Sequence, residues 1–195
     1  MSVSPAVRRP TPAWQKMRPI VEKDAATVVK FHRNALFHTG IPLLADRAAE
    51  HCESVWQDFF ITGSDRNARA FKIEENGIMV GFIHYSPVKP PGEFPPGTQC
   101  AKIHQIYVLS DRRNRGYGKT LFNYAYRQIE EQGHDVLLIN TPNNCPSADI
   151  FFDLRHAIPV RRDTPTSLAA INLNAPEDGL GEFMAAHAAN QAAAG

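Results

Sequence analysis

The stretch Ser110–Thr120 reads Ser-Asp-Arg-Arg-Asn-Arg-Gly-Tyr-Gly-Lys-Thr and lies between an apolar run and an amphipathic one. Its two glycines, Gly116 and Gly118, let the backbone turn without a Cβ in the way, so that successive N–H groups can converge on phosphate oxygens. A helix that begins here adds the positive end of its dipole, and the arginines of the stretch add charge. The stretch therefore predicts an anion-binding loop between a strand and a helix.

Two other glycine-rich nucleotide-binding loops do not fit this spacing. The P-loop pattern G-x-x-x-x-G-K-[ST] needs a glycine at the position that Arg113 occupies. The dinucleotide fingerprint G-x-G-x-x-G needs a third glycine, and Leu121 stands in that place. Neither of these two binding modes is therefore expected here.

Regular structure is expected on both sides of the loop. Residues 101–109 read as a strand, residues 116–132 as a helix that Gly133 ends, and residues 135–140 as another strand. The run Val136–Ile139 is continuously apolar, as in a strand that is covered on both faces. These segments predict a βαβ unit.

The chain before this unit shows both helical and strand periodicity. The expected elements are a strand at 18–21, a helix that opens at Lys23, a second helix over 44–60, and an antiparallel hairpin of 70–74 and 78–86 that turns at Gly77. The proline-rich stretch 87–98 is expected to form a stiff loop. Such a loop is either a lid or binding wall, or an inert surface excursion.

The chain after this unit closes the fold. A helix that follows Pro146 and takes in residues 150–154, and strands over 158–161 and 167–173, are expected. The order of elements predicts a mixed α/β fold in one domain, residues 17–175. Residues 1–16 are expected to be a mobile leader, and residues 176–195 an Ala-rich tail.

Composition argues against several classes of protein. Lys and Arg number 21 and Asp and Glu 20, so there is no bulk electrostatic case for a nucleic-acid or membrane-surface partner. Cys52, Cys100 and Cys145 form no C-x-x-C pair, and neither a disulfide framework nor a zinc site is indicated; no metal is expected. No apolar run of about 18 residues occurs. A soluble, cytoplasmic protein is therefore expected.

The loop resembles the acyl-CoA-binding signature of the GNAT superfamily of N-acetyltransferases, [Q/R]-x-x-G-x-[G/A], which residues 113–118 match. The apolar strand before it, the helix after it and Asn144 at the start of the next helix match as well. The resemblance covers residues 100–160 well, and residues 17–90 only in the order of elements. It implies an α/β, GNAT-like fold: a central, mixed and mostly antiparallel sheet of about six to seven strands, flanked by helices, with a βαβ acyl-CoA-binding unit.

The same resemblance implies acetyl-CoA as the acyl donor. In such proteins the thioester lies where two neighbouring strands splay apart. Carried over to this sequence, the resemblance implies that Val108 and Leu109 bind the pantetheine arm and that Asn144 binds its far end. The pyrophosphate would be bound by the loop residues Arg113, Asn114, Arg115, Gly116, Tyr117 and Gly118.

Attack of an amine on a thioester needs a base for the ammonium proton and an acid for the departing thiolate. Alternation along the strand places His104, Ile106 and Val108 on one face, and an imidazole titrates near neutral pH. His104 is therefore the candidate catalytic base, and the arylalkylamine acetyltransferases carry a histidine in a place that resembles it. The alternative is a hydrogen-bonded structural histidine.

The acid that the resemblance implies is a tyrosine on the helix after Asn144. This sequence has Phe151 and Phe152 in the aligned region. Substitutes are Tyr85, Cys145, His156 or a water molecule, and the sequence does not rank them.

The resemblance implies an N-acyltransferase that moves an acetyl group from acetyl-CoA directly to a primary amine of a small molecule, a peptide or a protein. One alternative, motivated by the missing tyrosine, is a non-catalytic CoA-binding or sensing domain. Another is an acyltransferase with an RNA-linked or ribosomal acceptor, motivated by the loop arginines together with Arg161 and Arg162. A homodimer is expected from the resemblance alone, and nothing in the sequence selects the acceptor.

Overall fold

The computed structural model describes residues 17–37, 45–62, 67–142, 157–162 and 166–174. The strands are β1 (Met17–Pro19), β2 (Arg69–Glu75), β3 (Ile78–Val88), β4 (Cys100–Val108), β5 (Val136–Pro142), β6 (Ile158–Arg162) and β7 (Thr166–Asn172). The helices are α1 (Ala25–Phe37), α2 (Ala45–Gln57) and α3 (Tyr117–Glu131), with short 3-10 turns η2 (Glu22–Asp24) and η5 (Ser110–Arg112) and a π turn η4 (Asp58–Thr62).

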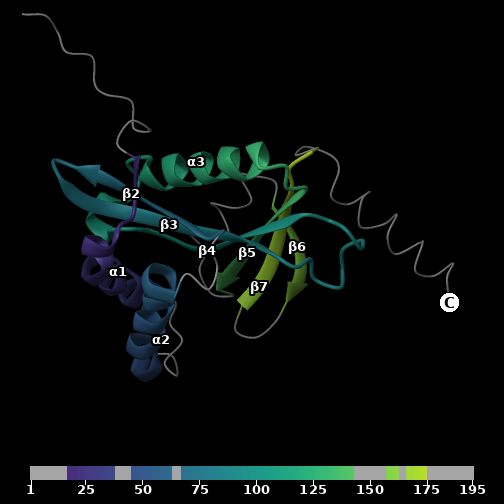
Figure 1. Ribbon diagram of the computed structural model, residues 1–195. Coiled ribbons are helices and arrows are strands. Elements are labelled where there is room, and N and C mark those ends of the chain that lie inside the picture. The colour runs from purple at the N-terminus through teal and green to yellow at the C-terminus, as the bar shows by residue number, and fades with distance from the viewer. Residues whose placement is uncertain (1–16, 38–44, 63–66, 143–156, 163–165, 175–195) are drawn as a thin grey trace, which may run out of the picture.

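The seven strands form one sheet in the order β1-β2-β3-β4-β5-β7-β6. Strands β4 and β5 are parallel, and every other neighbouring pair is antiparallel. Helix α3 connects the two parallel strands and covers one face of the sheet, while α1 and α2 cover the other face (Figure 1). This is the mixed, mostly antiparallel α/β sheet with a βαβ unit that the sequence predicts.

The predicted elements appear with small shifts at their ends. The hairpin turn is made by Asn76 and Gly77, whose φ angles of 53° and 78° are both positive, as a two-residue turn of this kind requires. Gly133, with φ 79°, follows the end of α3 as predicted. The predicted leader 1–16, the tail 176–195 and the helix over 150–154 lie outside the described residues. In the parts that the structure describes, no helix is both long and apolar enough to cross a membrane.

The core is split by the sheet into an α3 side and an α1/α2 side. On the α3 side, Leu121, Ala125 and Ile129 pack against strand residues such as Ile83 and Ile103. On the α1/α2 side, the buried residues are Ile20, Val28, Phe31, Trp56, Ala70, Met79, Phe82 and Tyr107. The aromatic face predicted for the second helix is therefore core, with Trp56 only 1% exposed.

The proline-rich loop between β3 and β4 is an ordered part of the fold. Two turns shape it, with Phe94 N–H donating to Pro91 O at 3.0 Å and Thr98 N–H donating to Pro95 O at 3.2 Å. Phe94 is 3% exposed and packs in a third apolar cluster with Val136 and Leu138 of β5. The buried anchor argues against the inert surface excursion that the sequence left open.

Gly81 lets β3, β4 and α3 come together at one point. A Cβ on this residue would lie 2.6 Å from the Tyr107 carbonyl oxygen and 3.1 Å from Leu121 Cδ1. The first of these contacts is with backbone that is held in the sheet, since β3 and β4 pair there. The glycine is therefore required for close packing of the end of β4.

The change Gly81→Ala should destabilise the protein by about 1–3 kcal/mol, because the added methyl group forces β4 away from β3. The midpoint of urea unfolding measures the loss. Gly92→Ala is the matched control, since nothing lies within 4 Å of a Cβ there. Equal midpoints for the two variants would contradict the close approach at Gly81.

Candidate functional site

Strands β4 and β5 separate in the middle of the sheet. Their parallel pairing runs only from Cys100↔Val136 to Ile103↔Ile139. Beyond that point β4 stays with β3, while β5 continues beside β7 from Asn140↔Leu168 onward. Among the described residues, no strand pairs with residues 104–108 on the side toward β5. The splay leaves a strand edge to which an extended ligand can hydrogen-bond.

A β-bulge lies where the two strands part. In the register of β3 with β4, His84 pairs with Gln105 and Tyr85 pairs with Ile103, so His104 is the extra residue. The extra residue reverses the alternation along β4. Ile106 therefore packs on the α3 side of the sheet, whereas the ring of His104 lies 5.0 Å from that of His84 on the α1/α2 side.

This geometry corrects one part of the sequence prediction. Simple alternation places His104 on one face with Ile106 and Val108, and the bulge places it on the opposite face. His104 is exposed, and its Nε2 lies 2.9 Å from Ser86 Oγ. His84 beside it is 8% exposed and packs against Trp56 and Phe59, with ring distances of 5.3 and 5.6 Å. The candidate base thus has a side chain open to a substrate and a hydroxyl that orients its ring.

The next residue along β4, Gln105, is tied to the helix layer. Its side-chain nitrogen lies 2.5 Å from Nε2 of His32 on α1. His32 is 2% exposed. Burial disfavours the imidazolium and, with a smaller effect of His51, lowers the pKa of His32 to about 4. His32 is therefore neutral near pH 7 and accepts a hydrogen bond from the Gln105 amide.

The predicted anion-binding loop leads from β4 to α3. Leu109 N–H donates to Val80 O at 3.0 Å and its carbonyl accepts from Arg112 N–H at 2.9 Å, so both of its peptide groups are used within the fold. Asn114 and Gly116 have positive φ angles of 59° and 82°. Gly116 is the N-cap of α3, whose first-turn N–H groups have no acceptor within the helix. The loop thus presents N–H groups at the positive end of a helix dipole.

We call residues 109–118 the cradle. The predicted cofactor-binding residues Leu109, Arg113, Asn114, Arg115, Gly116, Tyr117 and Gly118 lie together in it, and Val108 ends the strand that leads into it. Asn144 lies outside the described residues. The structure therefore brings together all but one of the predicted cofactor-binding residues, while His104 lies at the bulge.

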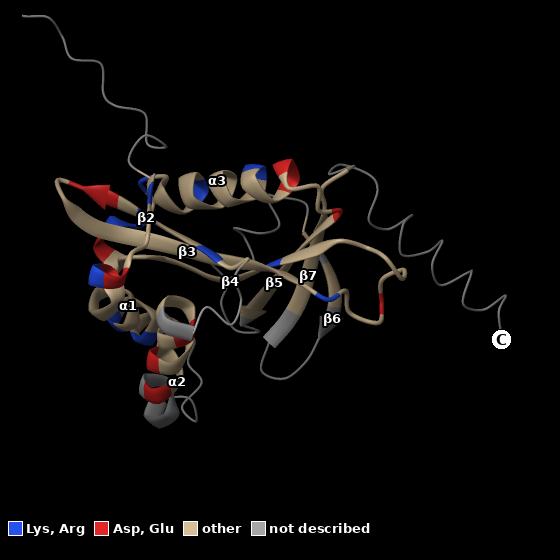
Figure 2. Ribbon diagram, in the orientation of Figure 1, with Lys and Arg blue, Asp and Glu red and all other residues tan. Residues whose placement is uncertain are grey.

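The cradle is less positively charged than its arginines suggest. Arg112 forms ion pairs with Glu75 at 3.0 Å and with Asp111 at 2.9 Å. Arg113 donates from Nε to Val108 O at 3.2 Å, and its guanidinium lies 5.9 Å from the centre of the Tyr107 ring. Glu75 belongs to the acidic end of β2, at the tip of the hairpin (Figure 2). Backbone N–H groups therefore matter more here than net charge.

The substitutes for the missing tyrosine narrow in the structure. Tyr85 is 1% exposed on the α3 side, and burial raises its pKa to about 12. A phenol without exposed surface cannot reach a thiolate in the splay. Cys145, His156, Phe151 and Phe152 lie outside the described residues. Within the described ranges, no group of three or more His, Cys, Asp or Glu side chains could hold a metal ion.

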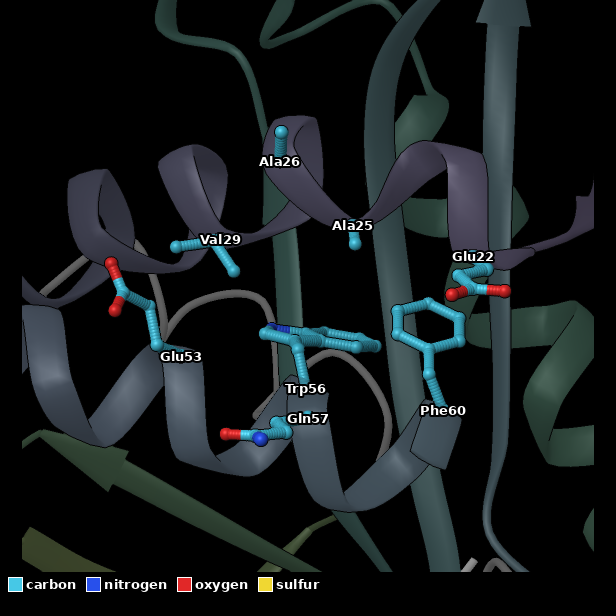
Figure 3. A pocket seen from close by; sticks show the side chains of 8 residues that line it. All are labelled: Glu22, Ala25, Ala26, Val29, Glu53, Trp56, Gln57 and Phe60. Carbon is cyan, nitrogen blue, oxygen red and sulfur yellow. The ribbon is translucent and has the colours of Figure 1, made fainter. Parts of the chain in front are cut away.

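A groove of about 340 Å³ lies between α1 and α2 (Figure 3). Glu53 lies toward one end, Glu22 toward the other, and Trp56 and Phe60 line it between them. No cradle residue and no bulge residue lines it. Because Trp56 is 1% exposed, the floor offers a ligand almost no aromatic surface. The groove is therefore separate from the splay and the cradle.

Sequence reasoning missed the partners that hold this site in place. Ser86 and His84 come from β3, and Glu75 from the end of β2. These residues meet the bulge or the cradle only through strand pairing and a one-residue slip in register. A bulge leaves no mark in composition or periodicity, so no sequence signal identifies them.

Comparison with known proteins agrees with this geometry. The model of the acetyltransferase (GNAT) family matches residues 37–151. The structure of PaiA N-acetyltransferase from Thermoplasma acidophilum in complex with coenzyme A is similar at 14% identity and a TM-score of 0.60, over 80% of this chain and 97% of that one. A GCN5-related N-acetyltransferase from Ralstonia eutropha JMP134 is similar at 18% identity and a TM-score of 0.63, over 76% and 96%. An N-acetyltransferase from Staphylococcus aureus Mu50 is similar at 15% identity and a TM-score of 0.62, over 80% and 97%. No curated protein sequence matches the chain.

The buried, neutral His32 should make the protein less stable as the pH falls from 6.5 toward 4. Its pKa is about 4 in the folded chain and about 6.5 in an unfolded one, so in this window the unfolded chain binds the extra proton. The stabilisation is complete above pH 6.5, and at pH 5 roughly 2 kcal/mol of it is lost.

Urea unfolding of the native chain and of His32→Gln at pH 7.5 and pH 5 tests this effect. The native chain should lose about 2 kcal/mol more between the two pH values than the variant loses. His51→Gln, a change at an exposed histidine beside it, should keep most of the native pH dependence. An equal loss in the native chain and in His32→Gln would contradict a neutral imidazole at this position.

Proposed function

Because the chain belongs to the acetyltransferase (GNAT) family, we propose that it moves an acetyl group from acetyl-CoA directly to a primary amine of a small-molecule, peptide or protein acceptor. Acyl transfer is the activity of the family. The observation that carries the proposal is the splay of β4 from β5, which leads into the cradle at the start of α3. The acceptor itself is not specified by these features.

In this proposal the donor lies along the free edge of β4 and ends at the cradle. The pantetheine arm, which carries amide groups, hydrogen-bonds to the strand edge up to Val108, and Leu109 adds only its apolar side chain because its peptide groups are already used. The pyrophosphate is bound by the N–H groups of residues 113–118. Asn144 is proposed, from its place in the family pattern, for the far end of the arm.

The proposed base is His104. The acceptor ammonium loses a proton to the imidazole, its nitrogen attacks the thioester carbon, and CoA leaves as a thiolate that must be protonated. Exposure of His104 at the bulge and its hydrogen bond to Ser86 support this role. With Tyr85 buried, the proton for the thiolate comes from water or from a residue outside the described ranges.

An RNA-linked or ribosomal acceptor receives less support. Two of the cradle arginines, Arg112 and Arg113, are already engaged within the protein, so less charge is left for nucleic-acid phosphates than the sequence suggests. A cytoplasmic location remains part of the proposal; buried, unpaired thiols at Cys52 and Cys100 support it. A homodimer remains a prediction from the family resemblance.

Saturating acetyl-CoA should raise the melting temperature of the native protein by about 5 to 10 °C, since ligand at 100 times its dissociation constant stabilises by roughly 2.7 kcal/mol. Gly118→Val should abolish the rise and leave the melting temperature of the free protein nearly unchanged, because a side chain in the first turn of α3 blocks the approach of phosphate. Gly92→Val, in an open part of the proline-rich loop, is the control. A normal rise in Gly118→Val would remove the cradle from the donor site.

His104→Ala should lower kcat by about 10²- to 10³-fold with little change in the affinity for acetyl-CoA. The defect should shrink at high pH, where the amine is deprotonated without help. Thiol release with a panel of amines, followed as a function of pH, measures this, and His51→Ala is the control at an exposed histidine. An unchanged pH profile would assign the proton to another base. Absence of turnover with every amine, despite tight binding of acetyl-CoA, would favour the CoA-sensing alternative.

A further inference from the structure

The end of β2 contacts the cradle at two points. Glu75 Oε2 lies 3.0 Å from Nε of Arg112, and Glu75 Oε1 accepts a hydrogen bond of 2.5 Å from the Tyr117 hydroxyl. Arg112 is the last residue of η5, and Tyr117 is the first of α3. A single carboxylate thus joins the two ends of the segment 113–116, which contains both positive-φ residues of the cradle.

We propose that Glu75 is a positioning residue for acyl-CoA binding, because it holds the two ends of the phosphate-binding segment at a fixed separation. This inference rests on the proposed function, since it takes the cradle to be the phosphate site. It adds a residue that lies far from the cradle in the chain and that the signature pattern does not contain.

The segment needs such a support because its own backbone does little to order it. Within residues 67–142, the N–H groups of Asn114, Arg115 and Gly116 donate no backbone hydrogen bond. These are N–H groups that a phosphate would use, so the segment cannot consume them to order itself. Binding to a segment that is already ordered loses less conformational entropy than binding to a loose one.

The two contacts differ in strength and exposure. Tyr117 is 8% exposed, and the hydrogen bond to Glu75, followed by burial, raises the pKa of its hydroxyl. The phenol therefore stays protonated and donates to the carboxylate. The Glu75 and Arg112 side chains are about one-third exposed, so water weakens their ion pair. The Tyr117 contact should therefore contribute more to positioning than the Arg112 contact.

A purely electrostatic argument predicts the opposite effect. A carboxylate near a phosphate site repels the ligand, so its removal should strengthen binding. However, Glu75 is paired with Arg112, and Arg112 keeps Asp111 as a second partner at 2.9 Å when Glu75 is removed. The charge that would be released is small and exposed, and salt screens it. Ordering of the segment should therefore outweigh repulsion.

Titration of the full-length protein with CoA by calorimetry tests the proposal. Glu75→Ala should raise the dissociation constant by about 10-fold or more, because two charge-assisted contacts are lost. Glu75→Gln should raise it less, since its amide oxygen can still accept from Tyr117. Tyr117→Phe should weaken binding as well, and the double variant Glu75→Ala/Tyr117→Phe should bind no more weakly than Glu75→Ala alone. Glu130→Ala, an exposed carboxylate at the other end of α3, is the matched control.

Steady-state kinetics separate positioning from a general loss of structure. The KM for acetyl-CoA should rise in Glu75→Ala, while kcat and the KM for the amine remain close to the native values. The effect should persist when salt is raised, since it does not depend on long-range charge. Unchanged or tighter CoA binding by Glu75→Ala would overturn the inference, as would additive losses in the double variant.

Two further results keep the test decisive. If Glu75→Ala does not fold, Tyr117→Phe and Glu75→Gln still remove one contact each, and native CoA affinity in both would overturn the inference. A native protein that does not bind CoA at all would instead defeat the proposed function. The failures of the two proposals are thus distinguishable.

Discussion

Parallel pairing between β4 and β5 stops after Ile103↔Ile139, and the site depends on that limit. Each strand has a second neighbour that continues past this point, β3 for β4 and β7 for β5. Both strands can therefore diverge without losing all of their ladder hydrogen bonds, and the sheet opens without unfolding. The opening exposes backbone groups of β4 that a neighbouring strand would otherwise pair with. A ligand with amide groups of its own can satisfy them.

Two bulges on neighbouring strands shape the two ends of this opening. At one end, Val80 is the extra residue where β3 slips against β2, and its carbonyl accepts the Leu109 N–H that begins the cradle. At the other end, His104 is the extra residue where β4 slips against β3. Each bulge turns one group out of the regular ladder. Gly81, next to the first bulge, keeps β3 close enough to β4 for both geometries to coexist.

The sequence predicted the fold and the cradle well because both depend on local patterns. The apolar run Val136–Ile139, the glycine pair before α3 and the turn at Gly77 report on backbone conformation within a few residues. Register does not have such a local signal. The face on which His104 lies depends on one extra residue in β4, and period-two reasoning fails across a bulge. Glu75 and Ser86 likewise reach their partners through pairing between distant segments, which one sequence alone does not reveal.

The sheet also separates the two halves of the proposed reaction. The cradle and α3 lie on one side, while His104, with His84 and Ser86, faces the helix layer of α1 and α2 on the other. A thioester bound along the β4 edge lies between these two sides, so an amine can approach it only from the side of the base. Because the bulge alone turns His104 to that side, a regular β4 would leave the imidazole in the α3 core. The register slip is therefore what allows the donor and the base to approach the reacting carbon from opposite faces.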